Sequence, residues 1–388
     1  MKILVVSDKF KGTMTSAQAG ESIARGLRLA ALQNGVPLQV EVIPVADGGD
    51  GMLEAIAAQV PVKRLQTESS DPLLRPMMAD LLLSEDGTCA YLEMARTNGL
   101  WLLDPDQRNP LQTTTYGLGE LLRFAIVKLR VKRVVIGLGG SATNDGGVGM
   151  LQALGYRFDA DGSLEEDVAA YLKSIRGIDD QYVDRLCPGL REVCIEIACD
   201  VTNPLLGPFG ATRVFGKQKG GTPASLDRLE EGMQHWARIA TDYLGQDWSL
   251  VPGAGAAGGV GFALCGFLNG TMRRGWEFLA EFANLEQKIQ QADRVITGEG
   301  SFDAQSLQGK LPHGIATLCA QHHKPLYVFC GKASVDAATY RAVGIRAVHS
   351  LREIERRGDV CLRFASKLLE FLVAQKFSGL FATCESPL

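Results

Sequence analysis

Short runs rich in valine, isoleucine and leucine recur along this chain and alternate with segments of helical periodicity. The runs cover residues 3–6, 40–45, 134–138, 194–198, 294–297 and 326–330. Apolar runs of strand length that are separated by helices are typical of parallel α/β layers. The clearest helices are predicted over residues 16–32, 116–129, 225–244 and 359–376, because apolar residues recur there at helical spacing.

The length of the chain predicts more than one domain. Its 388 residues, 46% of them hydrophobic, exceed what a single core usually fills. Residues 61–65, 77–83 and 90–94 predict consecutive strands joined by turns, so one sheet should have a mixed or antiparallel extension. We therefore expect two α/β domains, one with a Rossmann- or flavodoxin-like parallel sheet and one with a mixed sheet.

The domain boundaries are predicted where the chain can cross from one domain to the other. The stretch 98–115, which carries two prolines, is one such crossing, and the region near residue 284 is another. Residues 1–97 and 285–388 would then form a discontinuous outer domain, and residues 98–284 an inserted domain that carries the glycine-rich loops. We expect the active site in the cleft between them.

Charge and cysteine usage narrow the class of function. The net charge is −4 at pH 7 and there is no run of lysine and arginine, so we expect neither a nucleic-acid nor a membrane partner. No segment of the sequence reaches membrane-spanning length. The nine scattered cysteines lack C-x-x-C spacing and the five histidines lack ligand spacing, which favours reduced thiols and no zinc site. We expect a cytoplasmic protein acting on small molecules, either a monomer or a homodimer.

A glycine-rich loop follows the strand at 134–138 and leads into a helix predicted at 148–154. Its sequence is Gly139-Gly140-Ser141-Ala142-Thr143-Asn144-Asp145-Gly146-Gly147. Such a loop brings backbone N–H groups close to an anion and places that anion at the positive end of a helix dipole. Because Asp145 would repel a bare phosphate, the loop predicts a nucleotide accompanied by magnesium.

Polar and glycine residues also follow other predicted strands. The segments are 8–11, 47–51, 200–204 and 297–300. In open α/β sheets ligands bind at the carboxyl ends of the strands, so these segments predict one site. Taken alone, Asp47 to Gly51 could equally be ordinary turn chemistry.

Two more segments allow two interpretations each. Residues 253–259, with Gly255 and Gly258, could let helices pack closely or could contact phosphate or substrate. Residues 217–220, with Lys217 and Lys219, could be a solvated turn or could neutralise a transferred phosphoryl group.

The glycine pattern leaves more than one class of nucleotide protein open. No lysine has the setting of a Walker A loop, which excludes a P-loop protein. Gly137 to Ala142 does satisfy G-x-G-x-x-A, with Asp159 about 20 residues further on, so an NAD-linked hydroxy-acid dehydrogenase is the rival interpretation. The surplus of carboxylates at strand ends suits a metal and a phosphoryl group better. A non-catalytic nucleotide-binding sensor is the third alternative.

Several of these segments together resemble the bacterial glycerate kinase family. They are residues 8–12, 45–49, 139–147, 199–205, 215–220, 252–259 and 297–300, in order over nearly the whole chain. The resemblance implies ATP-dependent phosphorylation of D-glycerate by a two-domain α/β enzyme. The expected product is 2-phosphoglycerate, with 3-phosphoglycerate as the alternative.

The residues can then be given expected roles in phosphoryl transfer. ATP would be bound by Gly139, Gly140, Ser141, Thr143, Asn144, Asp145, Gly146, Gly255 and Gly258. Asp145 or Asp200 would bind Mg²⁺, Lys217 and Lys219 would neutralise the transferred group, and Lys11 would hold the carboxylate of the acceptor. Asp47 is expected to act as general base or to orient the acceptor hydroxyl, and Glu299 to contact a metal or hydroxyl group.

The chain departs from the family pattern at three positions. Lys9 is extra in the first motif, Ser301 stands where an arginine is usual, and Arg96 stands where a small residue is usual. One expectation is that Lys9 or Arg96 replaces the lost positive charge. The other is that the acceptor differs from glycerate.

Overall fold

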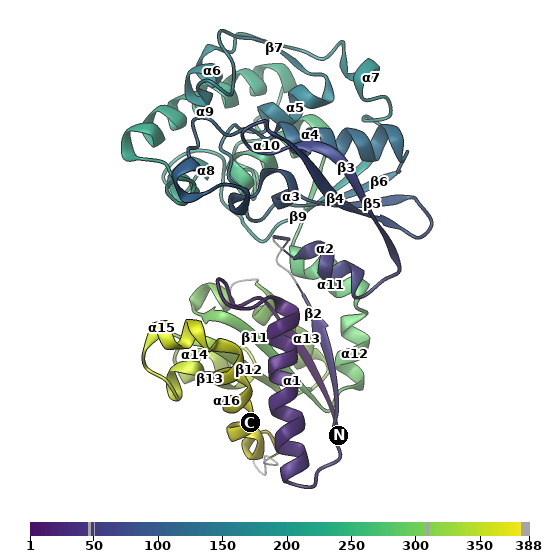
Figure 1. The fold of residues 1–388 in the computed structure, drawn as a ribbon, viewed down its shortest axis with the longest axis vertical. Helices are drawn as coiled ribbons and strands as arrows, with labels where there is room; N and C mark the ends of the chain where they lie inside the picture. Colours follow the sequence, from purple (N-terminus) through teal and green to yellow (C-terminus); the bar gives the residue numbers. More distant parts are fainter. Residues whose placement is uncertain (46–47, 50, 308–309, 382–388) are drawn as a thin grey trace. The chain divides into compact units, whose positions relative to one another are not determined.

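The computed structural model describes residues 1–45, 48–49, 51–307 and 310–381 (Figure 1). By its internal contacts the chain divides into two compact units. Unit 1 comprises Met1–Asp47, Glu54–Gln59 and Trp276–Leu388, and unit 2 comprises Gly48–Leu53 and Val60–Gly275. The domain boundaries predicted from the sequence, and a site between the domains, stay predictions.

Unit 1 is built on a five-stranded sheet whose paired strands are all parallel. The strand order is β13-β12-β11-β1-β2. The strands are β1 (Lys2–Ser7), β2 (Gln39–Pro44), β11 (Arg294–Phe302), β12 (Leu326–Ala333) and β13 (Ile345–Ser350). The apolar runs predicted as strands at 3–6, 40–45, 294–297 and 326–330 all lie in or overlap this sheet, which is the predicted parallel sheet.

Two long helices of unit 1, α1 and α16, share a core. The helices of this unit are α1 (Ser16–Gln33), α12 (Leu285–Gln291), α13 (Leu311–Gln321), α14 (Ala337–Ala342), α15 (Gly358–Arg363) and α16 (Ala365–Phe381). Thr15 starts α1 with a capping box, because its side chain accepts the Gln18 N–H while the Gln18 side chain accepts the Thr15 N–H. Ile23 of α1 and Leu369 of α16 are fully buried in the same core.

The last predicted helix, over 359–376, is divided in the structure. Phe364 separates α15 from α16 with a φ of −118° and a ψ of 21°, outside the helical region. Its N–H still donates to the Val360 carbonyl, so α15 ends without losing this bond. The break lets α16 take its own direction along α1, and periodicity alone did not predict it.

Unit 2 is built on a six-stranded mixed sheet, in the order β10-β9-β6-β5-β4-β3. The strands are β3 (Val62–Ser70), β4 (Pro76–Ser84), β5 (Cys89–Glu93), β6 (Arg133–Gly137), β9 (Cys194–Ala198) and β10 (Thr271–Arg273). β4 pairs antiparallel with β3 and β5, and the other pairs are parallel. The predicted mixed extension is therefore confirmed. A small antiparallel sheet joins β7 (Arg157–Asp159) to β8 (Gly177–Asp179).

The helices of unit 2 surround this sheet. They are α3 (Ala95–Asn98), α4 (Tyr116–Arg123, continued by a π-helical turn Phe124–Lys128), α5 (Val148–Leu154), α6 (Val168–Ser174), α7 (Val183–Leu186), α8 (Ala211–Phe215), α9 (Pro223–Leu244) and α10 (Val260–Leu268). The division between the units falls within α2 (Met52–Ala57) and α11 (Gly275–Phe282).

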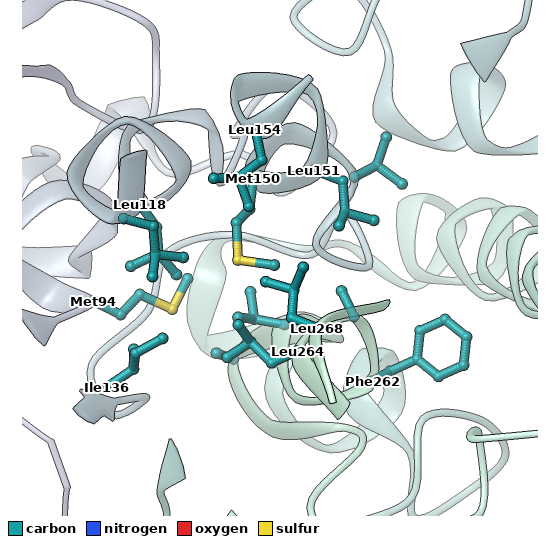
Figure 2. Packing of buried hydrophobic residues seen from close by; sticks show 14 of the residues in the cluster. Met94, Leu118, Ile136, Met150, Leu151, Leu154, Phe262, Leu264 and Leu268 are labelled. Carbon is teal, nitrogen blue, oxygen red and sulfur yellow. The ribbon is translucent and has the colours of Figure 1, made fainter. Parts of the chain in front are cut away.

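The core of unit 2 joins the sheet to α4, α5 and α10. Figure 2 shows Met150 of α5 between Leu118 of α4 and Leu264 of α10, with Ile136 of β6 nearby. All four side chains are fully buried. This packing fixes the place of α5, and therefore of the loop that precedes it. Within the described part of the chain, no helix is both long and apolar enough to cross a membrane.

Candidate active site

The glycine loop Gly139–Gly147 connects β6 to α5, as the sequence predicts, but most of it is buried. Gly140 is exposed and Gly139 is half-buried, whereas Ser141 is only 8% exposed. Thr143 and Asn144 have no exposed surface. Of the loop residues expected to bind ATP, the first two are therefore the most open to a ligand.

Asp145 is a fully buried carboxylate that five donors surround. Its Oδ2 accepts the Thr115 N–H at 2.8 Å, the Thr115 hydroxyl at 2.8 Å, the Gly149 N–H at 3.2 Å and the Thr114 hydroxyl at 3.4 Å. Its Oδ1 accepts the Gly147 N–H at 3.1 Å. Burial raises the pKa of Asp145, while these hydrogen bonds act to lower it.

This arrangement gives Asp145 a structural role in addition to its expected roles toward ATP and Mg²⁺, which stay predictions. The N–H groups of Gly147 and Gly149 at the start of α5 donate to the protein's own Asp145 carboxylate. Four donors reach Oδ2 and one reaches Oδ1, and all of them belong to unit 2. Asp145 therefore fixes the loop to α5 and to Thr115.

Lys217 and Lys219 lie in one short turn but have different surroundings. Lys219 is 1% exposed, and its Nζ donates to the Thr143 carbonyl at 2.6 Å. Burial lowers the pKa of Lys219 to about 7, although the charge of Asp145 opposes this shift. Lys219 therefore ties the turn to the glycine loop, and Lys217 is the exposed cation of the pair.

The second glycine segment packs against the first. A Cβ atom on Gly258 would lie 2.1 Å from the Thr143 carbonyl oxygen, which only glycine avoids. The Gly146 N–H donates to the Gly258 carbonyl at 2.9 Å, and the Gly255 N–H donates to the Asn203 carbonyl at 2.9 Å. Of the two interpretations of residues 253–259, close packing is the one that these contacts favour.

Trp236 of α9 supports the loop from its other side. Its indole Nε1 donates to the Gly146 carbonyl at 3.1 Å, and the whole side chain is buried. The ring stacks on Phe267 with a centroid distance of 5.6 Å. The carbonyl of the loop is thus held by a rigid aromatic group.

Asp200 follows β9 at the carboxyl edge of the same sheet and is half-buried. Its Oδ1 accepts the N–H of Gly275 at 2.8 Å. Among the described residues, no three histidine, cysteine, aspartate or glutamate side chains gather into a ready-made metal site. Enzymes usually hold Mg²⁺ through a carboxylate beside substrate phosphates, and the expected role of Asp200 as such a ligand stays a prediction.

The segment that carries the predicted base begins outside the described residues, since Asp47 is not among them. Gly48 and Gly49 are described, and they lie on the edge of the unit 2 sheet. The Gly139 N–H donates to the Gly48 carbonyl at 3.1 Å. A Cβ atom on Gly48 would lie 2.2 Å from the Ala198 carbonyl oxygen. This part of the chain is therefore packed directly against the start of the glycine loop.

Glu93 is a polar residue at this edge that the sequence analysis did not single out. It is the last residue of β5 and is 2% exposed. Its carboxylate accepts the Gly51 N–H at 3.3 Å and the Leu53 N–H at 3.2 Å. The sequence could have indicated Glu93, because it is a carboxylate at the end of an otherwise apolar strand. The same pattern singled out the polar residues at the other strand ends.

The polar residues of unit 1 gather at the carboxyl edge of its own sheet. The Asp8 N–H donates to the Gly298 carbonyl at 2.8 Å, which joins the end of β1 to β11. A Cβ atom on Gly300 would lie 3.2 Å from the backbone nitrogen of Lys11. Lys11, whose side chain is exposed, thus lies beside the strand that carries Glu299.

Glu299 has surroundings unlike those of Asp145. It is 8% exposed, and its Oε1 makes no hydrogen bond to the described part of the chain. Burial raises the pKa of Glu299 to about 7, and the charges of Asp8 and Asp303 add to this shift, while Ser306 and Lys310 oppose it. Glu299 is therefore a carboxylate that can exchange a proton near neutral pH.

Comparison of the sequence with known protein families gives a match over nearly the whole chain. The sequence profile of the glycerate kinase family matches residues 3–379. The chain belongs to the glycerate kinase family. This membership confirms both the resemblance seen in the sequence and the expectation of a phosphotransferase.

Individual relatives agree with the glycerate kinase assignment over most of their length. The glycerate 2-kinase of Escherichia coli K12 is 39% identical over 352 residues, which are 90% of each chain. The glycerate kinase of Bacillus subtilis 168 is 40% identical over 352 residues, again 90% of each chain. A crystal structure from Salmonella typhimurium LT2, provisionally named glycerate kinase 2, has 35% identity, a TM-score of 0.77 and 98% coverage of both chains.

The glycerate kinase assignment can be compared with the two alternative functions and with the positions at which this chain departs from the family pattern. Neither the family nor these relatives support an NAD-linked dehydrogenase or a non-catalytic sensor. Arg96 is already paired with Glu93, at 3.7 Å between its Nε and the Glu93 Oε1, so its charge is engaged within unit 2. Ser301 pairs in register with Lys332 of β12, which is exposed.

Proposed function

We propose that this protein transfers the γ-phosphoryl group of ATP to D-glycerate and forms 2-phosphoglycerate. The family match over residues 3–379 is the observation that carries the proposal. The choice of the 2-phosphate is supported by the relative from Escherichia coli, which is named glycerate 2-kinase. A cytoplasmic location and the choice between monomer and homodimer stay predictions.

We assign the nucleotide phosphates to the open end of the glycine loop. Gly139 and Gly140 are its least buried residues, and Ser141 follows them directly. Lys217, exposed in the turn that Lys219 ties to the loop, would neutralise charge on the transferred group. Thr143, Asn144, Asp145 and Lys219 are buried, so we assign them to holding the loop in shape.

Asp200 is the residue that we propose to hold Mg²⁺. Its carboxylate is half-buried at the end of β9, and its Oδ1 is already oriented by the Gly275 N–H. Magnesium, when bound, supplies charge neutralisation to the β- and γ-phosphates. Asp200 would orient that charge toward the phosphate side of the site.

The acceptor is assigned to the edge of the unit 1 sheet. Lys11 is exposed beside Gly300 and would bind the carboxylate of glycerate. Glu299, whose Oε1 has no hydrogen-bond partner among the residues that the structure describes, would accept a hydrogen bond from an acceptor hydroxyl. Asp47 remains the proposed general base from its place in the sequence. Asp47 would accept the proton of the acceptor hydroxyl as that oxygen bonds to the γ-phosphorus, while the bond between this phosphorus and the bridging oxygen breaks and ADP leaves.

A coupled ADP-release assay with Mg-ATP tests this proposal. The acceptors are D-glycerate, L-glycerate, glycolate and tartronate, and phosphorus NMR of the product identifies the phosphorylated position. Turnover with D-glycerate that yields the 2-phosphate is the expected result. A 3-phosphate product would correct the regiochemistry alone, whereas no ADP above the control without acceptor would reject the proposal.

A further inference from the structure

Three neighbouring strand ends of unit 2 converge on one short segment of the chain. In the sheet register, Glu93 of β5 lies beside Gly137 of β6, and Gly137 lies beside Ala198 of β9. Each of these positions touches the described residues of the segment Gly48–Leu53. The segment is therefore docked along the edge of the sheet.

The contacts on the three strands differ in chemistry. On β6 and β9 the contacts are close packing: a Cβ atom on Gly137 would lie 2.3 Å from the Gly48 carbonyl oxygen and 2.8 Å from the Met52 sulfur, and Gly48 meets Ala198 as described above. On β5 the contact is made by a side chain, because the Glu93 carboxylate accepts two backbone N–H groups of the segment. Glu93 thus anchors the segment to β5 through side-chain hydrogen bonds.

The N–H groups that Glu93 accepts belong to the start of α2. Gly51 precedes α2 and Leu53 is its second residue, so neither N–H has a partner within the helix. The carboxylate satisfies both and also lies favourably at the positive end of the helix. The Arg96 Nε lies 3.7 Å from Oε1 of the same carboxylate, which is 2% exposed.

The docked segment also touches the glycine loop. Gly139 donates its N–H to the Gly48 carbonyl, and a Cβ atom on Gly139 would lie 2.2 Å from the Gly49 Cα. A shift of Gly48 and Gly49 would therefore displace Gly139, the first residue that we assign to the phosphates.

We propose that Glu93 is a positioning residue for phosphoryl transfer, which holds Gly48 and Gly49 in the place that aligns the glycine loop. This inference rests on the proposed glycerate kinase activity. Glu93 touches neither substrate nor phosphate in this role and acts through the segment that it anchors. A small displacement at the reacting centre costs a large factor in rate, so the effect should appear in kcat.

The test compares Glu93→Gln and Glu93→Ala with Glu196→Gln. Glu196 is a matched control, because it lies on β9 of the same sheet and its carboxylate accepts from Arg133 at 2.7 Å and from Arg273 at 3.1 Å. All variants are assayed for ADP release with saturating Mg-ATP and D-glycerate, and their melting temperatures are measured. Glutamine keeps one acceptor oxygen, so the expected order of kcat is wild type, then Glu93→Gln, then Glu93→Ala.

We expect Glu93→Gln to lower kcat by about 10- to 100-fold, with smaller changes in either KM, while Glu196→Gln keeps the wild-type kcat. Melting temperatures near that of the control would separate positioning from loss of fold. An unchanged kcat in Glu93→Gln, or an equal loss in Glu196→Gln, would overturn the inference. If the wild type itself released no ADP with D-glycerate, the proposed function would fail, which is a distinct result.

Discussion

Asp145 and Glu299 are both buried carboxylates at the carboxyl edge of a sheet, one in each unit, but they differ in what surrounds their oxygens. Asp145 accepts hydrogen bonds from five donors on unit 2. Glu299 has an Oε1 with no partner in the described residues. A carboxylate whose oxygens are all occupied fixes structure, whereas one with an unpartnered oxygen is available to a ligand or a proton.

Removal of the Asp145 charge tests the structural half of this comparison. We expect Asp145→Asn to lower the free energy of unfolding by about 3 kcal/mol, because an amide nitrogen would face donors that now bind a carboxylate. Urea unfolding at pH 7 measures the change. Asp161→Asn, at an exposed ion pair with Arg176, is the control and should change stability by less than about 0.5 kcal/mol. A stable Asp145→Asn protein with altered magnesium dependence would break the comparison.

Removal of the Glu299 charge tests the chemical half. We expect Glu299→Gln to lower kcat/KM for D-glycerate by about 100-fold, or about 2.7 kcal/mol. Because the pKa of Glu299 is raised to about 7, wild-type kcat/KM should increase with pH through neutrality, and this acid limb should be absent in the variant. Glu286→Gln, at an exposed carboxylate near His322, should keep the wild-type pH profile. If kcat/KM of Glu299→Gln still increased with pH through neutrality, the titration that controls activity would belong to another group.

Lys219, which is buried beside the loop that carries Asp145, should make the free energy of unfolding depend on pH. Its pKa is lowered from 10.5 to about 7, so between these values the unfolded chain holds a proton that the folded protein lacks. The free energy of unfolding should therefore rise with pH across this window. We expect wild type to gain about 2 kcal/mol relative to Lys219→Met between pH 7 and pH 9, measured by urea unfolding. Parallel curves for the two proteins would contradict the lowered pKa.

Lys217 gives the smallest expected effect. Because its side chain is exposed, we expect Lys217→Ala to raise the KM for ATP by about tenfold, or about 1.4 kcal/mol, and to leave the melting temperature unchanged. Substrate-saturation kinetics measure the change. Lys173→Ala, at an exposed lysine paired with Glu231 elsewhere in unit 2, is the matched control. If Lys217→Ala kept the wild-type KM for ATP, we would infer that another cation neutralises the charge of the transferred phosphoryl group.

The elements of the fold were largely predictable because they depend on local patterns. The strand at 134–138, the glycine loop and the helix at 148–154 occur in the structure close to where periodicity placed them. The hydrogen bonds of Asp145 were not predictable from the same stretch, because its main donors come from Thr115, 30 residues earlier in the chain. The sequence indicated an anion at the start of α5 but not that the chain supplies that anion itself.

The same reason explains why Glu93 was missed. Its partners Gly51 and Leu53 lie about 40 residues away, and they reach Glu93 because Gly48 and Gly49 pack on the neighbouring strand ends and on the glycine loop. Lys219 could be recognised as a cation near a glycine-rich sequence, but its burial depends on Thr143, 76 residues away. Local sequence thus located the polar residues, and tertiary contacts decided which of them are exposed.

Trp236 gives the protein an intrinsic optical probe of its glycine loop. The indole is fully buried and donates to the Gly146 carbonyl, so its emission should be blue-shifted and should respond when the loop changes its hydrogen bonding. Trp101, by contrast, is 59% exposed and would report mainly on solvent. Nucleotide titrations could therefore be followed by fluorescence without a label, with the Trp236→Phe protein identifying the signal that belongs to the loop.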